Sequence, residues 1–438
     1  MNQNQAKRLL DRVLVLAKSG KSEAIASLRN TRGGNSRFAV NEITSSSEVE
    51  TLSLSVTVKI GKRAATATTN QLDDRSIDDV VSRAQRMAKL SPENPESMPP
   101  LGKQKYIAVP RASDPATVNA TPELRAKAAG AAIAAAKGAK VTIAGFYEHG
   151  THVSALASTG GLHAFHAWTS VDLSCSARTP DGTGSGWAGA TSNRVGDLDA
   201  AALAKTAVDK ATQSAKPRRL EPGKYTVVLE PNAVAGLLDS FTGNLGARRA
   251  DEGRSFFTKA GGGTKIGQKL FPDIITLRSD PADAGLASAP FDGEGFPRAP
   301  TKWLDKGTLT GLTYSRYWAQ KQGKQPTGNP DGWILEGGTA TREQLIKDVK
   351  RGVLITRFWY IRQLDPQTIL LTGLTRDGTF LIENGAIAGP VNNFRFNESP
   401  VQMLARCDAL TATVLTEGAR VPALRTHEFN LASVSEAV

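Results

Sequence analysis

KYTVVLEPNAVAGLLDSFTGN, residues 224–244, decides the fold of the second half of this chain. Its first residues are mostly β-branched or aromatic and predict a strand. The proline at 231 suits the first turn of a helix. The apolar residues of that helix recur on one face, so the pattern predicts a strand that leads straight into a core helix: Val234, Leu237, Leu238 and Phe241.

The polar residues at the end of this helix are Asp239, Ser240 and Asn244, and they directly follow a Leu-Leu pair. Near the other end of the chain, Val414 opens a Val-Leu-Thr-Glu-Gly segment that is soon followed by Val-Pro. Three further segments lie between them. They are the acidic glycine loop 291–295 (FDGEG), the segment 337–339 (GGT) before a helix, and 380–385 (FLIENG) with the following Pro390-Val391 and Arg395-Phe396-Asn397.

In their order and spacing these segments resemble the TldD/TldE family, also called PmbA or modulator of DNA gyrase. The resemblance covers most of the chain and is clearest from Tyr225 to Pro422. In one subunit type of that family a His-Glu-x-x-x-His motif follows the Leu-Leu pair, and a Cys-Gly-Lys-x-Gly segment near the C-terminus supplies a third zinc ligand. The resemblance therefore implies a zinc peptidase fold.

The positions that match those metal-site residues carry different side chains here. Asp239 stands at the first His, Ser240 at the general-base Glu, Asn244 at the second His and Val414 at the Cys. A catalytic zinc needs about three protein ligands and an open water position, and valine has no lone pair to offer. We therefore expect no catalytic residue, no metal site and no cofactor in this chain.

The resemblance implies the TldE-like branch, a metal-free subunit that pairs with a metal-bearing TldD-like subunit. In that interpretation zinc lies in the partner, the substrates are small or unfolded peptides, and this chain shapes an enclosed cavity. A homodimer is the alternative assembly. The carboxylates of Asp292 and Glu294 are predicted to line the cavity or to have a structural role in their loop.

Two other functions remain open at this stage. One is a stand-alone peptide-binding protein or divergent hydrolase, for which Asp239, Asp292 and Glu294 are the first residues to test. The other is a gyrase-associated or nucleic-acid-associated factor, which the net charge of +12 raises. The basic residues are scattered, with no zinc-finger spacing and no aromatic-interleaved basic motif, which disfavours nucleic-acid binding.

The length and composition predict a soluble protein of two to three domains. The 438 residues contain 40% hydrophobic side chains, and no run approaches the ~18 apolar residues of a membrane span. Near the N-terminus, Leu9, Val13 and Leu16 fit one face of a helix ending at Gly20 rather than a signal peptide. With two cysteines, predicted to be buried thiols, the chain suits a reducing compartment, and we expect a cytoplasmic location.

We predict an α+β fold with two domains. Residues 1–217 form an N-terminal α/β domain with helices on a sheet, and residues 218–438 form a C-terminal, mainly antiparallel, β-rich domain. Helices are expected from the Ser76-x-x-Asp79 capping pattern, from Thr121 to Gly138, from about 198 to 215 and from Thr341. Strands are expected at 52–58, 141–146, 152–157, 162–175, 353–360, 368–372 and 379–382, with Asn384-Gly385 as a tight turn.

Four histidines lie in the predicted hairpin around Gly160-Gly161: His149, His152, His163 and His166. The turn pairs His163 near Ser158 and His152 near Thr169, which separates those histidines by about 20 Å at ~3.3 Å per residue. Residues three apart on a strand also face opposite sides. These histidines are therefore predicted to be structural rather than metal ligands.

Overall fold

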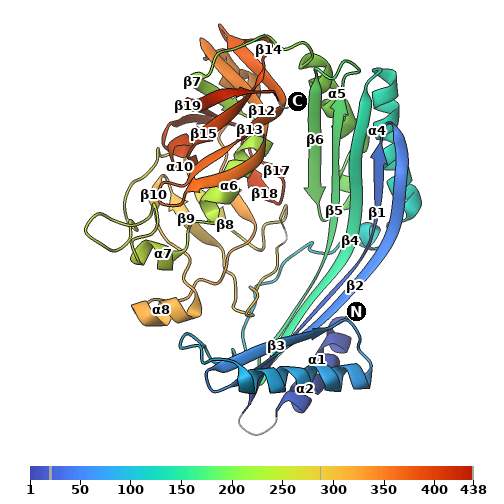
Figure 1. The fold of residues 1–438 in the computed structure, drawn as a ribbon, viewed down its shortest axis with the longest axis vertical. Helices are drawn as coiled ribbons and strands as arrows, with labels where there is room; N and C mark the ends of the chain where they lie inside the picture. Colours follow the sequence, from blue (N-terminus) through green and yellow to red (C-terminus); the bar gives the residue numbers. More distant parts are fainter. Residues whose placement is uncertain (19–21, 287, 437–438) are drawn as a thin grey trace.

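The computed structural model describes residues 1–18, 22–286 and 288–436, and its fold is α+β. Every strand before residue 217 in the described part belongs to one antiparallel sheet, with the order β3-β2-β1-β4-β5-β6. Figure 1 shows the long strands of this sheet running from one pair of helices to another. The strands are β1 (Glu23–Ala39), β2 (Glu42–Ile60), β3 (Arg63–Thr69), β4 (Thr142–Ser158), β5 (His163–Arg178) and β6 (Ser185–Ser192).

One face of this sheet is covered by helices. Helices α1 (Gln3–Ala17) and α2 (Asp74–Leu90) pack at one end, and α4 (Pro122–Gly138) and α5 (Ala200–Gln213) pack at the other end (Figure 1). The short helix α3 (Pro115–Val118) and a 3-10 turn at Val195–Asp197 complete this half. Alternate strand residues such as Leu28 and Leu54 are fully buried under the helices, whereas their neighbours face the other half of the molecule.

The register of the β4–β5 hairpin differs from the prediction by one residue. His163 lies opposite Ala157 and His152 lies opposite Trp168, because Ser158, the last residue of β4, closes the turn by accepting the backbone N–H of Gly161 and donating its own to the carbonyl of Leu162. His149 and His152 point to opposite faces, as expected for residues three apart on a strand. Among the described residues no group of three or more His, Cys, Asp or Glu side chains is placed to hold a metal.

The second half is built on two sheets. In the larger one, β12, β7, β19, β15 and β13 pair in that order and β13 pairs back to β12, so that these five strands close into a ring. These strands are β7 (Gly223–Leu229), β12 (Arg351–Asp365), β13 (Leu370–Glu383), β15 (Asn393–Glu398) and β19 (Leu424–Ser435), with β14 (Ala386–Pro390) and β16 (Cys407–Leu410) attached.

The smaller sheet has the order β10-β9-β8-β11-β18-β17. Its strands are β8 (Leu277–Ser279), β9 (Thr301–Asp305), β10 (Thr308–Leu309), β11 (Trp333–Leu335), β17 (Val414–Thr416) and β18 (Ala419–Val421). The helices of this half are α6 (Pro231–Thr242), α7 (Ala247–Asp251), α8 (Arg316–Gln322), α9 (Arg342–Lys347) and α10 (Pro400–Ala405).

Helix α6 follows β7 directly, as predicted, and supplies the centre of the largest core. Its four predicted core residues are all at most 1% exposed: Val234, Leu237, Leu238 and Phe241. Phe241 packs edge-on against Phe257 and Phe271, with ring centroids 5.6 and 5.9 Å apart. The helix is therefore held by its apolar face, whatever its polar residues do.

Several predicted element boundaries were wrong. Helix α2 begins at Asp74, because the Asp73 carboxylate caps it by accepting the backbone N–H of Ser76, so Ser76 lies inside the helix rather than at its N-cap. The strands predicted at 141–146 and 152–157 form one strand, β4, and those at 368–372 and 379–382 belong largely to β13. In each case the prediction divided one long strand in two at polar or glycine residues. A long strand tolerates such residues when one of its faces is covered.

The buried face of α1 was also shifted in the prediction. Leu10, Val13 and Leu14 are buried, whereas Leu16 is 37% exposed. Its predicted end at Gly20 lies outside the described residues. Both cysteines, Cys175 and Cys407, are buried free thiols, as predicted, and burial raises the pKa of each to about 12. Within the described ranges no helix is long and apolar enough to cross a membrane.

Candidate functional site

The polar end of α6 carries three of the positions singled out from the sequence. Asp239 is exposed and Ser240 is half-buried, whereas Asn244 is buried just beyond the helix. The Asn244 side-chain amide donates a 2.7 Å hydrogen bond to the carbonyl of Ser240. Asn244 is thus engaged in closing the C-terminal end of the helix.

The fourth position lies on a neighbouring element. Val414 opens the β17–β18 hairpin, and this hairpin packs against α6. The hydroxyl of Thr416 donates a hydrogen bond to the side chain of Asn232 on α6, which fixes the hairpin to the helix. Sequence positions almost two hundred residues apart are therefore brought together, as the resemblance requires.

These four side chains do not fit a catalytic zinc. Val414 has no donor atom, and the Asn244 amide is already bonded to the helix end. That leaves one carboxylate, Asp239, and one hydroxyl, Ser240, which is fewer than the three ligands that a catalytic zinc requires. The described part of the chain offers no other group of metal ligands.

Carboxylates gather where the hairpin faces the N-terminal sheet. Burial, together with the charges of Glu148 and Glu417, raises the pKa of Asp172 on β5 to about 6. Desolvation also raises the pKa of Glu417 at the hairpin turn, and Asp239 adds to that effect. Arg357 on β12 has the opposite effect and lowers the pKa of Glu417. The junction of the two halves therefore carries a set of mutually repelling carboxylates.

Arg357 is one of the links across this junction. Its guanidinium donates to the Asp377 carboxylate at 3.1 Å and lies 4.3 Å from the centre of the Trp187 ring. Trp187 belongs to β6 of the N-terminal sheet, whereas Arg357 and Asp377 belong to the ring of the second half. A cation over a partly desolvated aromatic ring contributes about 1 kcal/mol.

A cavity of about 540 Å³ lies between the N-terminal sheet and the loops of the second half. The sheet contributes side chains from its polar face, among them Arg29, Thr31, Trp168 and Ser170. The opposite wall includes Asp292 and Arg298 of one loop and Leu415 and Gly418 of the β17–β18 hairpin. The mixture of polar groups with the two aromatic rings of Trp168 and Phe291 is typical of a ligand-binding cavity.

The acidic loop predicted to line a cavity does reach this one. Asp292 lies in the cavity wall, and its carboxylate accepts the backbone N–H groups of Glu294 and Phe296, both at 2.9 Å, and that of Asn329 at 3.1 Å. Glu294 lies in the wall of a neighbouring hollow of about 290 Å³ and pairs with Arg316 at 3.2 Å. Asp292 thus shapes its own loop by accepting backbone hydrogen bonds.

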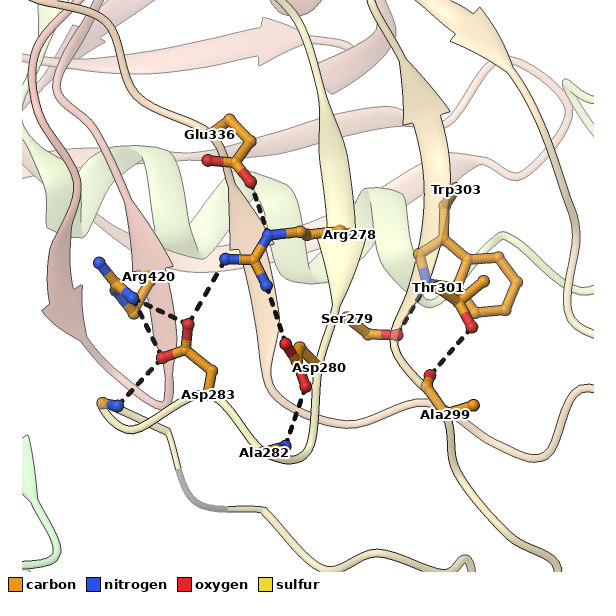
Figure 2. A network of polar contacts seen from close by, with 11 residues as sticks. Arg278, Ser279, Asp280, Ala282, Asp283, Ala299, Thr301, Trp303, Glu336 and Arg420 are labelled. Carbon is orange, nitrogen blue, oxygen red and sulfur yellow. Dashed lines mark hydrogen bonds and ion pairs between the residues drawn. The ribbon is translucent and has the colours of Figure 1, made fainter. Parts of the chain in front are cut away.

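A polar network holds the base of the facing wall, and Figure 2 shows it in close view. The Asp283 carboxylate accepts two hydrogen bonds from Arg420 of β18, at 3.0 and 2.9 Å. Arg278 of β8 reaches Glu336 at 2.6 Å and both Asp280 and Asp283 at 3.4 Å. This network joins β8, β18 and the loop after β8, and it adds charge pairs to the apolar packing of buried residues such as Leu277 and Val421.

The sequence analysis named His152 as a structural histidine but missed its position on the cavity side of the sheet, where it is hydrogen-bonded. Nε2 of His152 lies 2.7 Å from the Ser170 hydroxyl, and Nδ1 lies 3.1 Å from the Thr31 hydroxyl. The Trp168 ring stacks between His152 and His166, at 4.9 and 5.4 Å. Burial lowers the pKa of His152, so its ring is neutral at physiological pH. The signal was the alternation of polar and aromatic residues at 166, 168, 170 and 172.

Ion pairs form around Arg248 in the wall of the smaller hollow. Arg248 contacts both carboxylate oxygens of Glu96 at 2.8 Å and Glu252 at 3.0 Å. Asp251 instead accepts a 2.7 Å hydrogen bond from the indole N–H of Trp318. The Arg248 pair joins the loop after α2 to α7, so it links the two halves of the chain.

Comparison with protein-family models matches nearly the whole chain. Residues 25–88 match domain 1 of the PmbA/TldA metallopeptidases, residues 111–215 match the central domain, and residues 222–433 match the C-terminal domain.

Curated relatives share partial similarity. The Metalloprotease PmbA of Escherichia coli O157:H7 is 28% identical over 182 residues, which cover 40% of this chain and 38% of that protein. A metalloprotease of Methanothermobacter thermautotrophicus is 26% identical over 228 residues, covering 48% of this chain and 47% of that protein. The matched region thus covers less than half the length of each of these two relatives. A PmbA homologue of Haemophilus influenzae is 22% identical over 77% of this chain and 76% of its own.

Solved structures share the whole fold. TldE from Thermococcus kodakarensis superimposes with a TM-score of 0.86 at 18% identity, covering 97% of this chain and 99% of that chain. A Thermotoga maritima protein described as a candidate modulator of a DNA gyrase gives a TM-score of 0.87 at 19% identity, with the same coverage. At this level of identity the likeness concerns the fold alone.

Proposed function

Because this chain belongs to the TldD/TldE family, the PmbA/TldA metallopeptidases, we propose that it is the metal-free, TldE-like subunit of a two-subunit zinc peptidase. In this role the chain shapes the cavity that receives small or unfolded peptides, while zinc and the chemistry of peptide hydrolysis belong to a TldD-like partner. The protein is expected to act in the cytoplasm.

One observation carries the proposal. Helix α6 and the β17–β18 hairpin keep the framework of a metal site, yet the positions on them offer a single carboxylate and no thiolate or imidazole. The apolar face of α6 is fully buried, so core packing preserves the helix without any metal. A framework without ligands fits a subunit that supports another subunit's chemistry.

The cavity beside this framework supports a role in peptide handling. It combines neutral polar donors and acceptors, such as Ser170 and Thr31, with the broad ring of Trp168. An extended peptide needs both kinds of contact, hydrogen bonds for its backbone and apolar surface for its side chains. A stand-alone peptide-binding protein would use the same cavity, and it is the second candidate function.

The test combines purification with activity. The tagged chain is recovered from its native cytoplasm, and co-purifying proteins are sequenced and searched for His-Glu-x-x-x-His after a Leu-Leu pair. We expect such a partner in near-equal amount, zinc in the complex but not in the isolated chain, and peptide cleavage only by the complex. Stoichiometric zinc or cleavage in the isolated chain would overturn the proposal, and recovery of the chain alone would favour the stand-alone candidate.

A further inference from the structure

An exposed group of aromatic and basic side chains lies on the outer face of the ring, outside the cavity. Trp359 is 41% exposed and Tyr360 is 56% exposed, and their ring centroids are 5.5 Å apart. The guanidinium of Arg376 lies 4.3 Å from the centre of the Trp359 ring, and that of Arg362 lies 4.2 Å from the Tyr360 ring. We call these four residues the arginine–aromatic patch.

The patch is extended by a third arginine. Arg395 on β15 lies opposite Leu374, which itself lies opposite Trp359, so all three side chains leave the same face of the sheet. No carboxylate lies within ion-pair distance of Arg362, Arg376 or Arg395 in the described part of the chain. In contrast, Arg357, on the same strand, is paired with Asp377. The patch therefore presents unpaired positive charge.

The backbone under the patch is strained. Tyr360 adopts a φ of 55°, in the left-handed region that a bulky side chain avoids, and the β12–β13 register shifts between Trp359 and Arg362. Strain at a buried residue can be offset by core packing, but Tyr360 is more than half exposed. Conformations of this kind cluster at functional surfaces, where the bulge directs a side chain to a binding partner.

The bulge lies beside the candidate site. A methyl group placed on Gly236 of α6 would lie 3.2 Å from Cδ1 of Ile361, so the bulge packs directly on this helix. Asp239 is three residues further along α6, which is about one helical turn. A chain bound across the patch would therefore pass close to the junction where the cavity and the hairpin meet.

We propose that the arginine–aromatic patch, with Arg395, is a docking surface for acidic peptides that holds a carboxylate-bearing segment next to the candidate site. The proposal rests on the proposed peptide-handling role and names its substrate class. Guanidinium groups bind carboxylates through two parallel N–H donors, and contact with the rings holds Arg362 and Arg376 in place. The net charge of +12 favours an acidic partner over long range.

The geometry favours a peptide over single-stranded nucleic acid. Non-specific binding of single strands relies on bases stacking on open aromatic faces. Here one face of each exposed ring already carries a guanidinium, on Trp359 from Arg376 and on Tyr360 from Arg362. The guanidinium groups, in contrast, carry N–H donors suited to carboxylates.

The test measures fluorescence anisotropy of a labelled peptide of alternating glutamate and alanine with the isolated full-length chain. The double variant Arg362→Gln/Arg376→Gln is compared with Arg75→Gln/Arg86→Gln, which removes the same charge from the exposed surface of α2. We expect the patch variant to lose about tenfold or more in affinity and the control to stay within about twofold, because only the first loses charge-assisted hydrogen bonds.

Three further measurements test which groups on the chain and on the ligand are responsible for binding. Trp359→Ala keeps the charge and is expected to weaken binding, since it removes the support of Arg376. A glutamine version of the peptide is expected to bind much more weakly. Equal losses in both double variants, equal binding of the glutamine peptide, or tighter binding of a short oligothymidine would each overturn the proposal. Because the isolated chain is used, failure here is distinct from failure to find a zinc-bearing partner.

Discussion

The N-terminal sheet and the ring of the second half show two kinds of β-structure in one chain. In the β4–β5 hairpin the register runs without a shift from Thr142 to Ala157, and in β1–β2 it shifts at one point. In the β12–β13 pair it shifts at three points, and Tyr360, Ile369 and Asp377 along these strands have positive φ. The N-terminal sheet is thus regular in register, whereas the β12–β13 pair of the second half is irregular.

The difference follows from what covers each surface. Helices α1, α2, α4 and α5 cover one face of the N-terminal sheet, and a slip of one residue would expose the core side chains beneath them. Beyond residue 358 most of β12 is exposed, so its register is not fixed by burial there. At Tyr360 the irregular backbone lies where side chains meet solvent, and this is where the arginine–aromatic patch lies, whereas Ile369 and Asp377 are buried.

The largest effect is expected from weakening the regular sheet. Leu28 on β1 is fully buried under the helices, so Leu28→Ala should lower the free energy of unfolding by about 3 kcal/mol, through lost burial and an unfilled cavity. Its neighbour Ser27 points to the other face and lines the cavity. Ser27→Ala should change stability by less than about 0.5 kcal/mol. Denaturant unfolding of both variants checks this, and similar losses would contradict the division into a helix-covered and a cavity face.

The regular parts of the fold were largely predictable from the sequence. The period-two pattern at 52–58, the Gly160-Gly161 turn and the apolar face of α6 each reflect local chemistry, and all three are present. The Thr341 capping box and the Asn384-Gly385 turn were found for the same reason. Where burial alternates strictly, the sequence pattern and the structure carry the same information.

The candidate site was only partly predictable. The resemblance indicated that Asp239 and Val414 belong together, and they do lie on adjacent elements. The approach of Asp172 to Glu417 was not visible, because it depends on how two sheets meet across more than two hundred residues. The bulge at Tyr360 was also missed, since 353–360 looks like an ordinary strand and no local signal marks a left-handed tyrosine.

A smaller effect is expected where the two sheets meet. The folded-state pKa of Asp172 is about 6, above its ordinary value near 3.9, so the folded protein binds more protons than the unfolded chain between about pH 4 and 6. The folded protein therefore loses stability as pH rises through that window, because the Asp172 carboxyl becomes charged. Asp172→Asn should stabilise the protein at pH 7 by about 1 kcal/mol after allowance for solvent screening, and this gain should vanish near pH 4.

Thermal unfolding at several pH values measures this, with Asp181→Asn as the control. Hydrogen bonds from Thr179 and Thr183 lower the pKa of the exposed Asp181 carboxylate, so its substitution should act in the opposite direction at neutral pH. A gain for Asp172→Asn that persists unchanged at pH 4 would show that repulsion between the carboxylates is not its cause.

The smallest expected change tests the irregular strand itself. Tyr360→Gly removes the left-handed strain, a gain of about 1 kcal/mol, but glycine also makes the unfolded chain more flexible at a cost of about 0.5 to 1 kcal/mol. These two nearly cancel, which leaves the loss of the ring contacts with Trp359 and Arg362, so the free energy of unfolding should fall by no more than about 1 kcal/mol. Trp359→Gly, next to it and without positive φ, loses the same ring pair and the contact with Arg376, has no strain to release and should cost about 1 kcal/mol more. Urea unfolding of the two variants measures the difference. Equal losses of stability would mean that Tyr360 carries no strain. The contrast between the regular sheet and the ring would then rest on the register shifts alone.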